Sequence, residues 1–297
     1  MNSPRIALVS AKAARDLDDD LPPLEAALQR KGADVIRVEW DDADAPWESF
    51  DIALLRSTWD YTQRLSEFLD WLTRAAALTH LLNPLAVVRW NTDKHYLHDL
   101  AKVGVTTVPS FFIEPDHDGG EGVRAFLAQY LNAEFVVKPS VGAGSRDAQR
   151  YNRHQIEAAT QHAQRLLDDR RSVLLQPYFD RVDEHGETAL IFFAGKFSHA
   201  IRKGPLLRSD EAPTRALFAQ EHISTQQPNR EEFRLAETAL SAIPFDQPLL
   251  YARVDLIQDP SGSPALLELE LTEPSLFFAF DAGAADRFAD AVLRARR

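Results

Sequence analysis

The stretch ALLELELTEPSLFF, residues Ala265 to Phe278, alternates leucines with the glutamates Glu268 and Glu270. Strict alternation of apolar and polar residues predicts a β-strand with one buried face and one polar face. Pro274 ends the pattern, because proline cannot continue a strand ladder. The carboxylates on the polar face either point to water or point into a site that requires negative charge.

The segment YARVDLIQDPSGSPALLELEL, residues 251–271, predicts a hairpin that turns within DPSGSP. With the turn centred in that loop, Asp255 lies opposite Glu268 and Arg253 lies opposite Glu270. Directly opposed residues share a face of the sheet. The pattern therefore brings three carboxylates and one guanidinium together, and it predicts an apolar opposite face made of Val254, Leu256, Leu267 and Leu269.

Three carboxylates this close repel one another unless a cation lies among them. Oxygen ligands suit a hard cation such as Mg²⁺, which also binds phosphate oxygens. The alternative is a salt-bridged edge of the sheet with solvated carboxylates, and the hairpin alone does not decide between the two.

A glycine-rich loop follows another predicted strand, in VVKPSVGAGSRD, residues 136–147. Its small residues leave backbone N–H groups free to bind an anion, and the alternative is a flexible hairpin tip. It is not a P-loop, in which the lysine follows the glycines, and Asp147 replaces the third glycine of a dinucleotide fingerprint. Lys138 before the loop and Lys94 in NTDKHYL are candidate phosphate-binding cations.

The bulk composition is that of a soluble globular protein with two or three lobes: 297 residues, 45% hydrophobic and 26% charged. The formal net charge of −12 argues against nucleic acid or an anionic membrane as a partner. The absence of cysteine excludes disulfides and a thiolate nucleophile. No apolar run reaches the length of a membrane span or a signal segment, so a cytoplasmic protein is expected.

The pattern along the chain divides it into three parts. Residues 1–91 read as an α/β unit of the parallel-sheet type, residues 92–180 as a small α+β lobe with the glycine loop, and residues 181–297 as a second lobe with two hairpins. Residues 204–228 have no clear period and are interpreted as a substrate loop. Asp18 to Asp20 are interpreted as a solvated acidic loop. His95 and His98 have no carboxylate partner in their pattern and are interpreted as surface residues.

Taken in order, these features resemble the ATP-grasp superfamily, whose domain binds ATP between two α+β lobes. The resemblance covers about residues 91–297 and implies an N-terminal pre-ATP-grasp α/β domain followed by a two-lobed ATP-grasp domain. The stretches RSTWDY, VVRWNTDKHYL, HAIRKGP and LELTEPSLF are similar to the branch of the O-ureido-serine cyclo-ligase that forms cycloserine.

The resemblance implies a role for each candidate residue. The metal ligands are Asp255, Glu268 and Glu270, the last in place of the usual Asn, and the residues that stabilise an acyl phosphate are Arg202 and Arg253. The residues assigned to ATP in the phosphate, lid-loop, adenine and ribose sites are Lys94, Lys138, Gly142, Gly144, Ser145, Gln176, Pro177, Tyr178, Phe179, Asp183 and Glu187.

The prediction of the substrate site depends on the end of one predicted strand. The carboxyl ends of strands in α/β sheets usually carry the ligand site, and one predicted strand ends in RSTWD. Arg56 is interpreted as a carboxylate ligand and Glu273 as an amino-group ligand, and the alternative is a capping loop with its tryptophan in the core. The candidate substrate residues are Arg56, Ser57, Thr58, Trp59, Asp60, Lys203 and Glu273.

The implied activity is that of an ATP- and Mg²⁺-dependent ligase, with two metal ions and Mn²⁺ as a substitute. It activates a carboxylate, or a ureido- or carbamoyl-like group, as an acyl phosphate for attack by an amine, including ring closure of an amino-acid derivative. The alternatives are a non-catalytic ATP-binding regulatory module and an intermolecular ligase of the RimK or glutathione synthetase type. An NAD-dependent enzyme is disfavoured, because RIALVS is not followed by glycines. The expected partner is a small amino-acid-like molecule, and a homodimer is compatible with the sequence.

Overall fold

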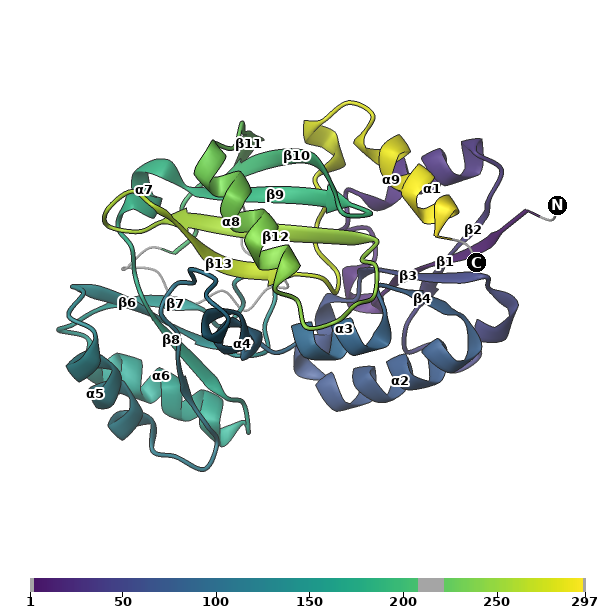
Figure 1. The fold of residues 1–297 in the computed structure, drawn as a ribbon. Coiled ribbons are helices and arrows are strands. Elements are labelled where there is room, and N and C mark those ends of the chain that lie inside the picture. Colours follow the sequence, from purple (N-terminus) through teal and green to yellow (C-terminus); the bar gives the residue numbers. More distant parts are fainter. Residues whose placement is uncertain (1–2, 208–221, 296–297) are drawn as a thin grey trace.

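The computed structural model describes residues 3–207 and 222–295, which form three sheets with flanking helices (Figure 1). The observed fold is mixed α/β, as the sequence predicts. The interpretation of residues 204–228 as a substrate loop falls mostly outside the described residues, and its described part contains the short strand β11 (Ile223–Thr225). No helix among the described residues combines the length and apolar character that crossing a bilayer requires.

The first sheet is fully parallel, with strand order β2-β1-β3-β4. Apolar runs form β1 and β3, because helices cover both faces of this sheet. Alternate residues of β1 enter different cores: Ile6 and Leu8 pack with α1, and Ala7 and Val9 pack with α2. The elements are β1 (Arg5–Ser10), η1 (Lys12–Ala14), α1 (Leu21–Arg30), β2 (Asp34–Glu39), η2 (Trp47–Ser49), β3 (Ile52–Ser57), η3 (Trp59–Gln63), α2 (Leu65–Leu78), β4 (His80–Leu82) and α3 (Leu85–Asn91).

The second sheet is antiparallel, with order β5-β8-β6-β7, and the helices α5 and α6 pack on one of its faces. Phe135 and Val137 of β6 face these helices, whereas Val136 and Lys138 line the cavity described below. This alternation follows from the strand's period of two. The elements are α4 (Tyr96–Lys102), β5 (Phe111–Ile113), α5 (Gly119–Gln129), β6 (Glu134–Pro139), β7 (Gln149–Asn152), α6 (Ile156–Asp168) and β8 (Val173–Pro177).

The third sheet is also antiparallel, with order β11-β10-β9-β12-β13, and α8 covers one face. Both predicted hairpins are confirmed: β9 and β10 turn at Ala194 and Gly195, and β12 pairs with β13. The remaining elements are α7 (Arg181–His185), β9 (Glu187–Phe193), β10 (Lys196–Lys203), α8 (Arg230–Ser241), β12 (Tyr251–Gln258), β13 (Pro264–Glu270), η4 (Phe278–Phe280) and α9 (Ala284–Arg294).

The register of β12 and β13 is the one that the sequence predicts, with Asp255 opposite Glu268 and Arg253 opposite Glu270. The register then shifts by one residue, because Leu256 pairs with Leu266. Leu267 is the extra residue of this bulge. Its expected place on the apolar face was therefore wrong, since Leu267 lines the cavity instead.

The outer edge of β13 is covered near Leu269 by polar side chains of α3 and α4. The Asn91 amide donates to the Leu269 carbonyl and accepts from the Leu271 N–H, both at 2.7 Å. The Tyr96 hydroxyl accepts from the Leu269 N–H at 2.9 Å. These bonds satisfy the backbone N–H and C=O groups at the edge of β13. They also hold the segment that carries Lys94 beside Glu268.

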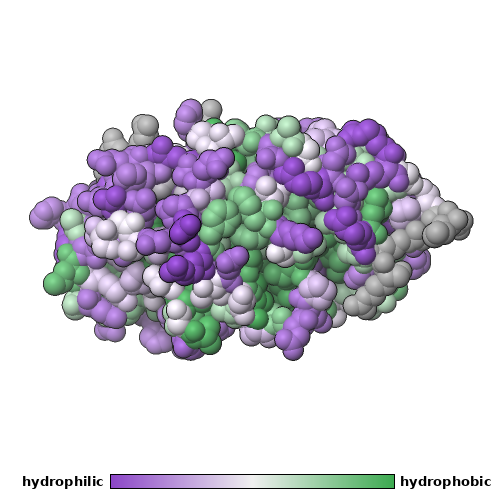
Figure 2. All heavy atoms as spheres, turned by 45° about the horizontal axis from the view of Figure 1, so that its top comes forward, coloured by the Kyte–Doolittle hydropathy of each residue, from purple (hydrophilic) through white to green (hydrophobic). Residues whose placement is uncertain are grey.

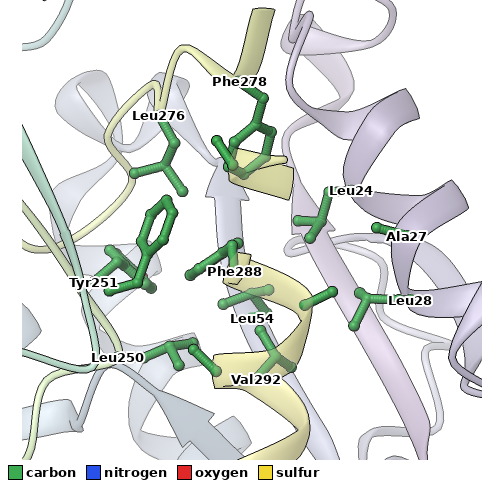
Figure 3. Packing of buried hydrophobic residues seen from close by; sticks show 14 of the residues in the cluster. Leu24, Ala27, Leu28, Leu54, Leu250, Tyr251, Leu276, Phe278, Phe288 and Val292 are labelled. Carbon is green, nitrogen blue, oxygen red and sulfur yellow. The ribbon is translucent and has the colours of Figure 1, made fainter. Parts of the chain in front are cut away.

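The last helix, α9, returns to the N-terminal part and packs against α1, so α9 lies on the same side of the molecule as the first sheet (Figure 1). Phe288 and Val292 of α9 lie between Leu24 of α1 and Tyr251 of β12 (Figure 3). The first and third sheets therefore share one core. Figure 2 shows that hydrophilic side chains cover much of one face, around an apolar patch near its middle.

Candidate active site

A cavity of about 710 Å³ is lined by residues of all three parts of the chain. This volume is typical of a small-molecule site. The predicted site residues that line it are Trp59, Lys94, Lys138, Gly142, Gly144, Ser145, Gln176, Pro177, Tyr178, Phe179, Glu187, Lys203, Arg253, Asp255, Glu268, Glu270 and Glu273. The predicted site residues outside the lining are Arg56, Ser57, Thr58, Asp60, Asp183 and Arg202.

Asp255 is the most enclosed of the three candidate metal ligands, with 1% of its surface exposed. Its carboxylate accepts hydrogen bonds from Lys203 at 2.8 Å and from the Arg253 guanidinium at 2.8 and 2.9 Å. Burial opposes ionisation, but Arg253 and Lys203 outweigh it and lower the pKa of Asp255 below its ordinary value. Asp255 is therefore a fixed negative charge on the cavity wall.

Glu268 lies between the two predicted phosphate-binding lysines. Its Oε1 accepts from Lys138 Nζ at 2.8 Å and lies 3.8 Å from Lys94 Nζ. Burial alone would raise the pKa of Glu268, but the two ammonium groups outweigh it and lower that pKa to about 2. Burial lowers the pKa of Lys138.

Glu270 is less well compensated than its two neighbours. The Arg253 guanidinium pairs with both Glu270 and Asp255, so the two carboxylates share one cation. Burial and the nearby Asp255 charge raise the pKa of Glu270 to about 7. Glu270 and Arg253 therefore form an ion pair in this structure.

The three carboxylates offer the oxygen donors that Mg²⁺ prefers. Within residues 3–207 and 222–295, no three acidic or histidine side chains are already drawn together as a metal cluster, because lysine and arginine occupy the spaces between them. The raised pKa of Glu270 means that its ionised form is poorly stabilised by the cations present. A divalent cation beside Glu270 would supply that stabilisation, so the three carboxylates fit Mg²⁺ as a donor set.

Strand alternation places Lys203, not Arg202, in the cavity. Lys203 pairs with Glu187 across the β9–β10 hairpin, and burial raises the pKa of Glu187 to about 8. Arg202 faces the other side of the sheet and donates to the Glu184 carbonyl. The expectation that Arg202 contacts an acyl phosphate is thus corrected, since its side chain points away from the carboxylates.

The glycine loop begins beside Lys94, whose Nζ donates to the Gly142 carbonyl at 2.7 Å. Gly144 has φ +60°, a left-handed conformation that glycine adopts without strain. Because Gly142, Gly144 and Ser145 line the cavity, this loop forms one wall of it.

The predicted adenine hinge lies at the end of β8. The Gln176 amide donates to the Ser110 hydroxyl at 3.0 Å, and Tyr178 lies under the Arg150 guanidinium at 3.7 Å. Asp183, expected at the ribose, accepts from Tyr178 at 2.6 Å and from Arg150, outside the cavity lining. Sequence reasoning missed the apolar lining of this end, which consists of Val108, Val136, Ile257 and Leu267.

The strand end at Arg56 contributes less to the cavity than expected. Arg56 is fully buried and donates to the Pro274 carbonyl at 3.0 Å, so it braces the loop after Glu273 and does not reach the cavity. Ser57 and Thr58 are fully buried as well, and Asp60 accepts from the Trp40 indole at 2.8 Å. The substrate roles expected for these four residues are therefore corrected.

Trp59 and Glu273 do meet at the cavity. The Trp59 indole donates to the Glu273 carbonyl at 3.2 Å, and the Tyr61 hydroxyl bonds the Glu273 side chain. Burial, and then the neighbouring Glu270 charge, raise the pKa of Glu273 to about 8.

Asp18 and Asp20 are buried, with 6% and 5% of their surface exposed, so their interpretation as a solvated loop is wrong. The Asp20 carboxylate accepts from three consecutive N–H groups, those of residues 276–278. Asp18 lines the cavity, and its Oδ2 has no hydrogen-bond partner within the described residues. Asp18 and Asp20 lie in the loop after β1. The carboxyl ends of strands usually carry the ligand site, and this observation, which pointed to RSTWD, points to the loop after β1 as well.

Comparison with known proteins supports the resemblance. Residues 6–83 match the family model described as the N-terminal domain of the D-cycloserine synthetase DcsG. The chain is 40% identical over 295 residues to the cycloserine biosynthesis protein DcsG of Streptomyces lavendulae, and the alignment covers 97% of each chain. The crystal structure of D-cycloserine synthetase DcsG matches with a TM-score of 0.91 at 39% identity, covering 99% of this chain and 100% of that one.

More distant structures share the fold alone. They include the ATP-grasp ligase PsnB with its minimal precursor (TM-score 0.66, 18% identity, 99% of each chain). The D-alanine–D-alanine ligase of Bacillus anthracis also matches (TM-score 0.70, 14% identity, 99% of this chain and 97% of that one). ATP and Mg²⁺ are the cofactors that ATP-grasp ligases generally use. The sequence resemblance is confirmed: the chain belongs to the family of the D-cycloserine synthetase DcsG, is an ATP-dependent ligase, and has the fold of the ATP-grasp ligases.

Proposed function

We propose that the enzyme activates the carboxylate of an amino-acid derivative as an acyl phosphate, which an amine of the same molecule then attacks to close a ring. The observation that carries this proposal is one cavity whose lining includes Asp255, Glu268 and Glu270, the lysines Lys94 and Lys138, and the glycine loop. Identity of 40% to a cycloserine biosynthesis protein supports the amino-acid class and ring closure.

In this proposal ATP lies between the hinge after β8 and the carboxylates. Its base occupies the apolar slot at Phe179 and Leu267, and its phosphates contact Lys94 and Lys138 beneath the glycine loop. Asp255, Glu268 and Glu270 would hold two Mg²⁺ ions, for which Mn²⁺ substitutes, and the bound metal supplies charge neutralisation during phosphoryl transfer.

The chain's own residues position the reactants and exclude water. A substrate carboxylate oxygen attacks the terminal phosphorus of ATP, and ADP leaves. An amine then attacks the acyl carbon, loses a proton and expels phosphate. Arg253 and Lys203 lie on the same face as the metal ligands, so they stabilise the negative charge that develops in both steps. The loop at Gly142–Ser145 protects the intermediate from hydrolysis.

Two further carboxylates of the cavity lining, Glu273 and Asp18, suit a cationic group. Glu273 lies close to Glu270, and Asp18 Oδ2 has no partner within the described residues. A substrate ammonium group paired with Glu273 would orient the molecule with its carboxylate toward the phosphates. This arrangement replaces the expected contact with Arg56.

A pH dependence follows from the raised pKa of Glu273, about 8. Below that pH the carboxyl is mostly protonated and binds an ammonium group weakly, so kcat/KM for the substrate should rise about five- to tenfold from pH 7 to pH 8.5. Glu273→Gln should flatten this rise and leave only the part that comes from the ionisation of Glu270 and Glu187. A variant whose kcat/KM climbs as steeply as that of the wild type would contradict the role of Glu273.

Phosphate release from ATP, measured with a panel of amino acids and ureido-amino acids, tests the proposed function. We expect stimulation by compounds with both a free carboxylate and a free amine, and a cyclic product for at least one of them. Stimulation only when a second amine is added would favour an intermolecular ligase. ATP binding with no stimulated turnover would favour a regulatory module. A cytoplasmic location and a homodimer stay predictions.

A further inference from the structure

Ser140 is held from two sides at the point where β6 leads into the glycine loop. Its N–H donates to the Ser172 carbonyl at 2.8 Å, and its own carbonyl accepts from the Lys94 N–H at 2.9 Å. Lys94 then reaches over the loop to the Gly142 carbonyl at 2.7 Å. The backbone around Ser140 therefore sets the place of Lys94 and the start of the loop together.

A closed ring of hydrogen-bonded side chains surrounds Ser140. His95 Nδ1 lies 2.6 Å from Asp93 Oδ1, and Nε2 lies 3.0 Å from Glu114 Oε1. The second Glu114 oxygen accepts from the Ser172 hydroxyl at 2.6 Å, and the Asp93 carboxylate is hydrogen-bonded to the Ser140 side chain. His95 thus joins both ends of the ring, and the expectation that it has no carboxylate partner is wrong.

Both ring nitrogens of His95 face carboxylates, so both must donate, which only the imidazolium form can do. The hydrogen bond to Asp93, and then Glu114, raise the pKa of His95. The other groups against the ring are Phe112, stacked at 3.9 Å, and His98, whose ring centre lies 6.5 Å away. With 38% of its side chain exposed, His95 exchanges its proton with solvent.

We propose that the His95 imidazolium is a positioning residue for ATP binding, which fixes Lys94 and the first residues of the glycine loop through Ser140. The inference rests on the proposed contact of Lys94 with the ATP phosphates. Loss of one proton leaves a ring nitrogen lone pair facing a carboxylate, which loosens the ring. Because partly exposed charge pairs are individually weak, the expected effect is a modest loss of ATP affinity and not a loss of catalysis.

The test is the Kd for MgATP, measured by calorimetry between pH 6 and pH 9 without substrate. Because Glu270 in the proposed metal site also titrates near pH 7, the variant and the wild type are compared at each pH. We expect the Kd of His95→Gln to exceed that of the wild type about two- to fivefold at pH 6, and the ratio of the two Kd values to fall toward one at pH 9, where His95 has lost its proton. His98→Gln is the matched control, since His98 contacts Phe112 and the Ser110 carbonyl and, among the described residues, no carboxylate, and it should keep the wild-type Kd at each pH.

Equal Kd profiles for His95→Gln and the wild type would overturn the inference, even if His95→Gln melts at a lower temperature. A shift in kcat at constant KM for ATP would also contradict it. Lys94→Met distinguishes a failure of the role proposed for His95 from a failure of the proposed contact between Lys94 and the ATP phosphates. Normal ATP affinity in Lys94→Met would overturn the phosphate contact itself, whereas weak binding there with a wild-type profile in His95→Gln would overturn only the role of His95.

Discussion

Replacing Glu268 with glutamine is expected to lower kcat roughly 100- to 10,000-fold, because a metal that stabilises phosphoryl transfer contributes several kcal/mol. Glu268 is ionised at every pH at which the enzyme is assayed, since its pKa is about 2. It also stands between Lys94 and Lys138. Glutamine keeps the shape of the side chain but removes the charge that the proposed metal site and both lysines require.

The measurement is steady-state phosphate release at saturating ATP, combined with circular dichroism to verify the fold. Glu237→Gln is the matched control, because Glu237 lies exposed on α8 outside the cavity, and it should retain wild-type kcat. MgATP binding measured separately distinguishes lost binding from lost chemistry. A folded Glu268→Gln enzyme with kcat within about threefold of the wild type would contradict the assignment of Glu268 as a metal ligand.

Asp255→Asn is expected to lower the free energy of unfolding by about 3–5 kcal/mol, the range found when one partner of a buried ion pair is removed. Asp255 is 1% exposed and accepts hydrogen bonds from Lys203 and Arg253. Asparagine removes the one carboxylate that both cations share, and it leaves Lys203 with Glu187 and Arg253 with Glu270, two carboxyls whose raised pKa values show that they are poorly ionised. The pKa of Asp255 is lowered in the folded protein, so its stabilising effect is present above the unfolded pKa and is lost as the pH falls through the folded pKa.

Urea unfolding at neutral pH measures this effect. Asp286→Asn is the matched control, because Asp286 pairs with Arg30 at 3.0 Å with about half of its side chain exposed, and its loss should cost at most about 1 kcal/mol. Equal stabilities for the two variants would contradict the account of Asp255 as the centre of a buried ion network.

The sequence was most informative about the C-terminal hairpin. Alternation and a short turn are local features, and they predicted the pairing of Asp255 with Glu268 correctly. The bulge at Leu267 was not predictable, because it depends on how β13 fits the neighbouring chain. The same limit explains Arg202: the sequence HAIRKGP places two cations side by side but does not decide which of them enters the cavity, and the observed register selects Lys203.

Contacts between residues far apart in the sequence were not predicted, for a different reason. Asp20 is buried because the N–H groups of residues 276–278 need an acceptor, and nothing near Asp20 in the sequence reveals this. Likewise, Glu114 becomes a partner of His95 only when β5 is placed beside α4. Arg56 was placed at the correct strand end, but its burial behind Pro274 depends on the loop that crosses it.

In the proposed mechanism this ligase makes an acyl phosphate from its substrate's carboxylate. A cyclising substrate with ¹⁸O in both carboxylate oxygens tests this step, followed by mass spectrometry of the phosphate released. The mechanism predicts that one ¹⁸O atom is transferred to phosphate for each ring closed, in the presence of Mg²⁺ and of Glu268. Phosphate that is formed together with cyclic product but contains no ¹⁸O would contradict it.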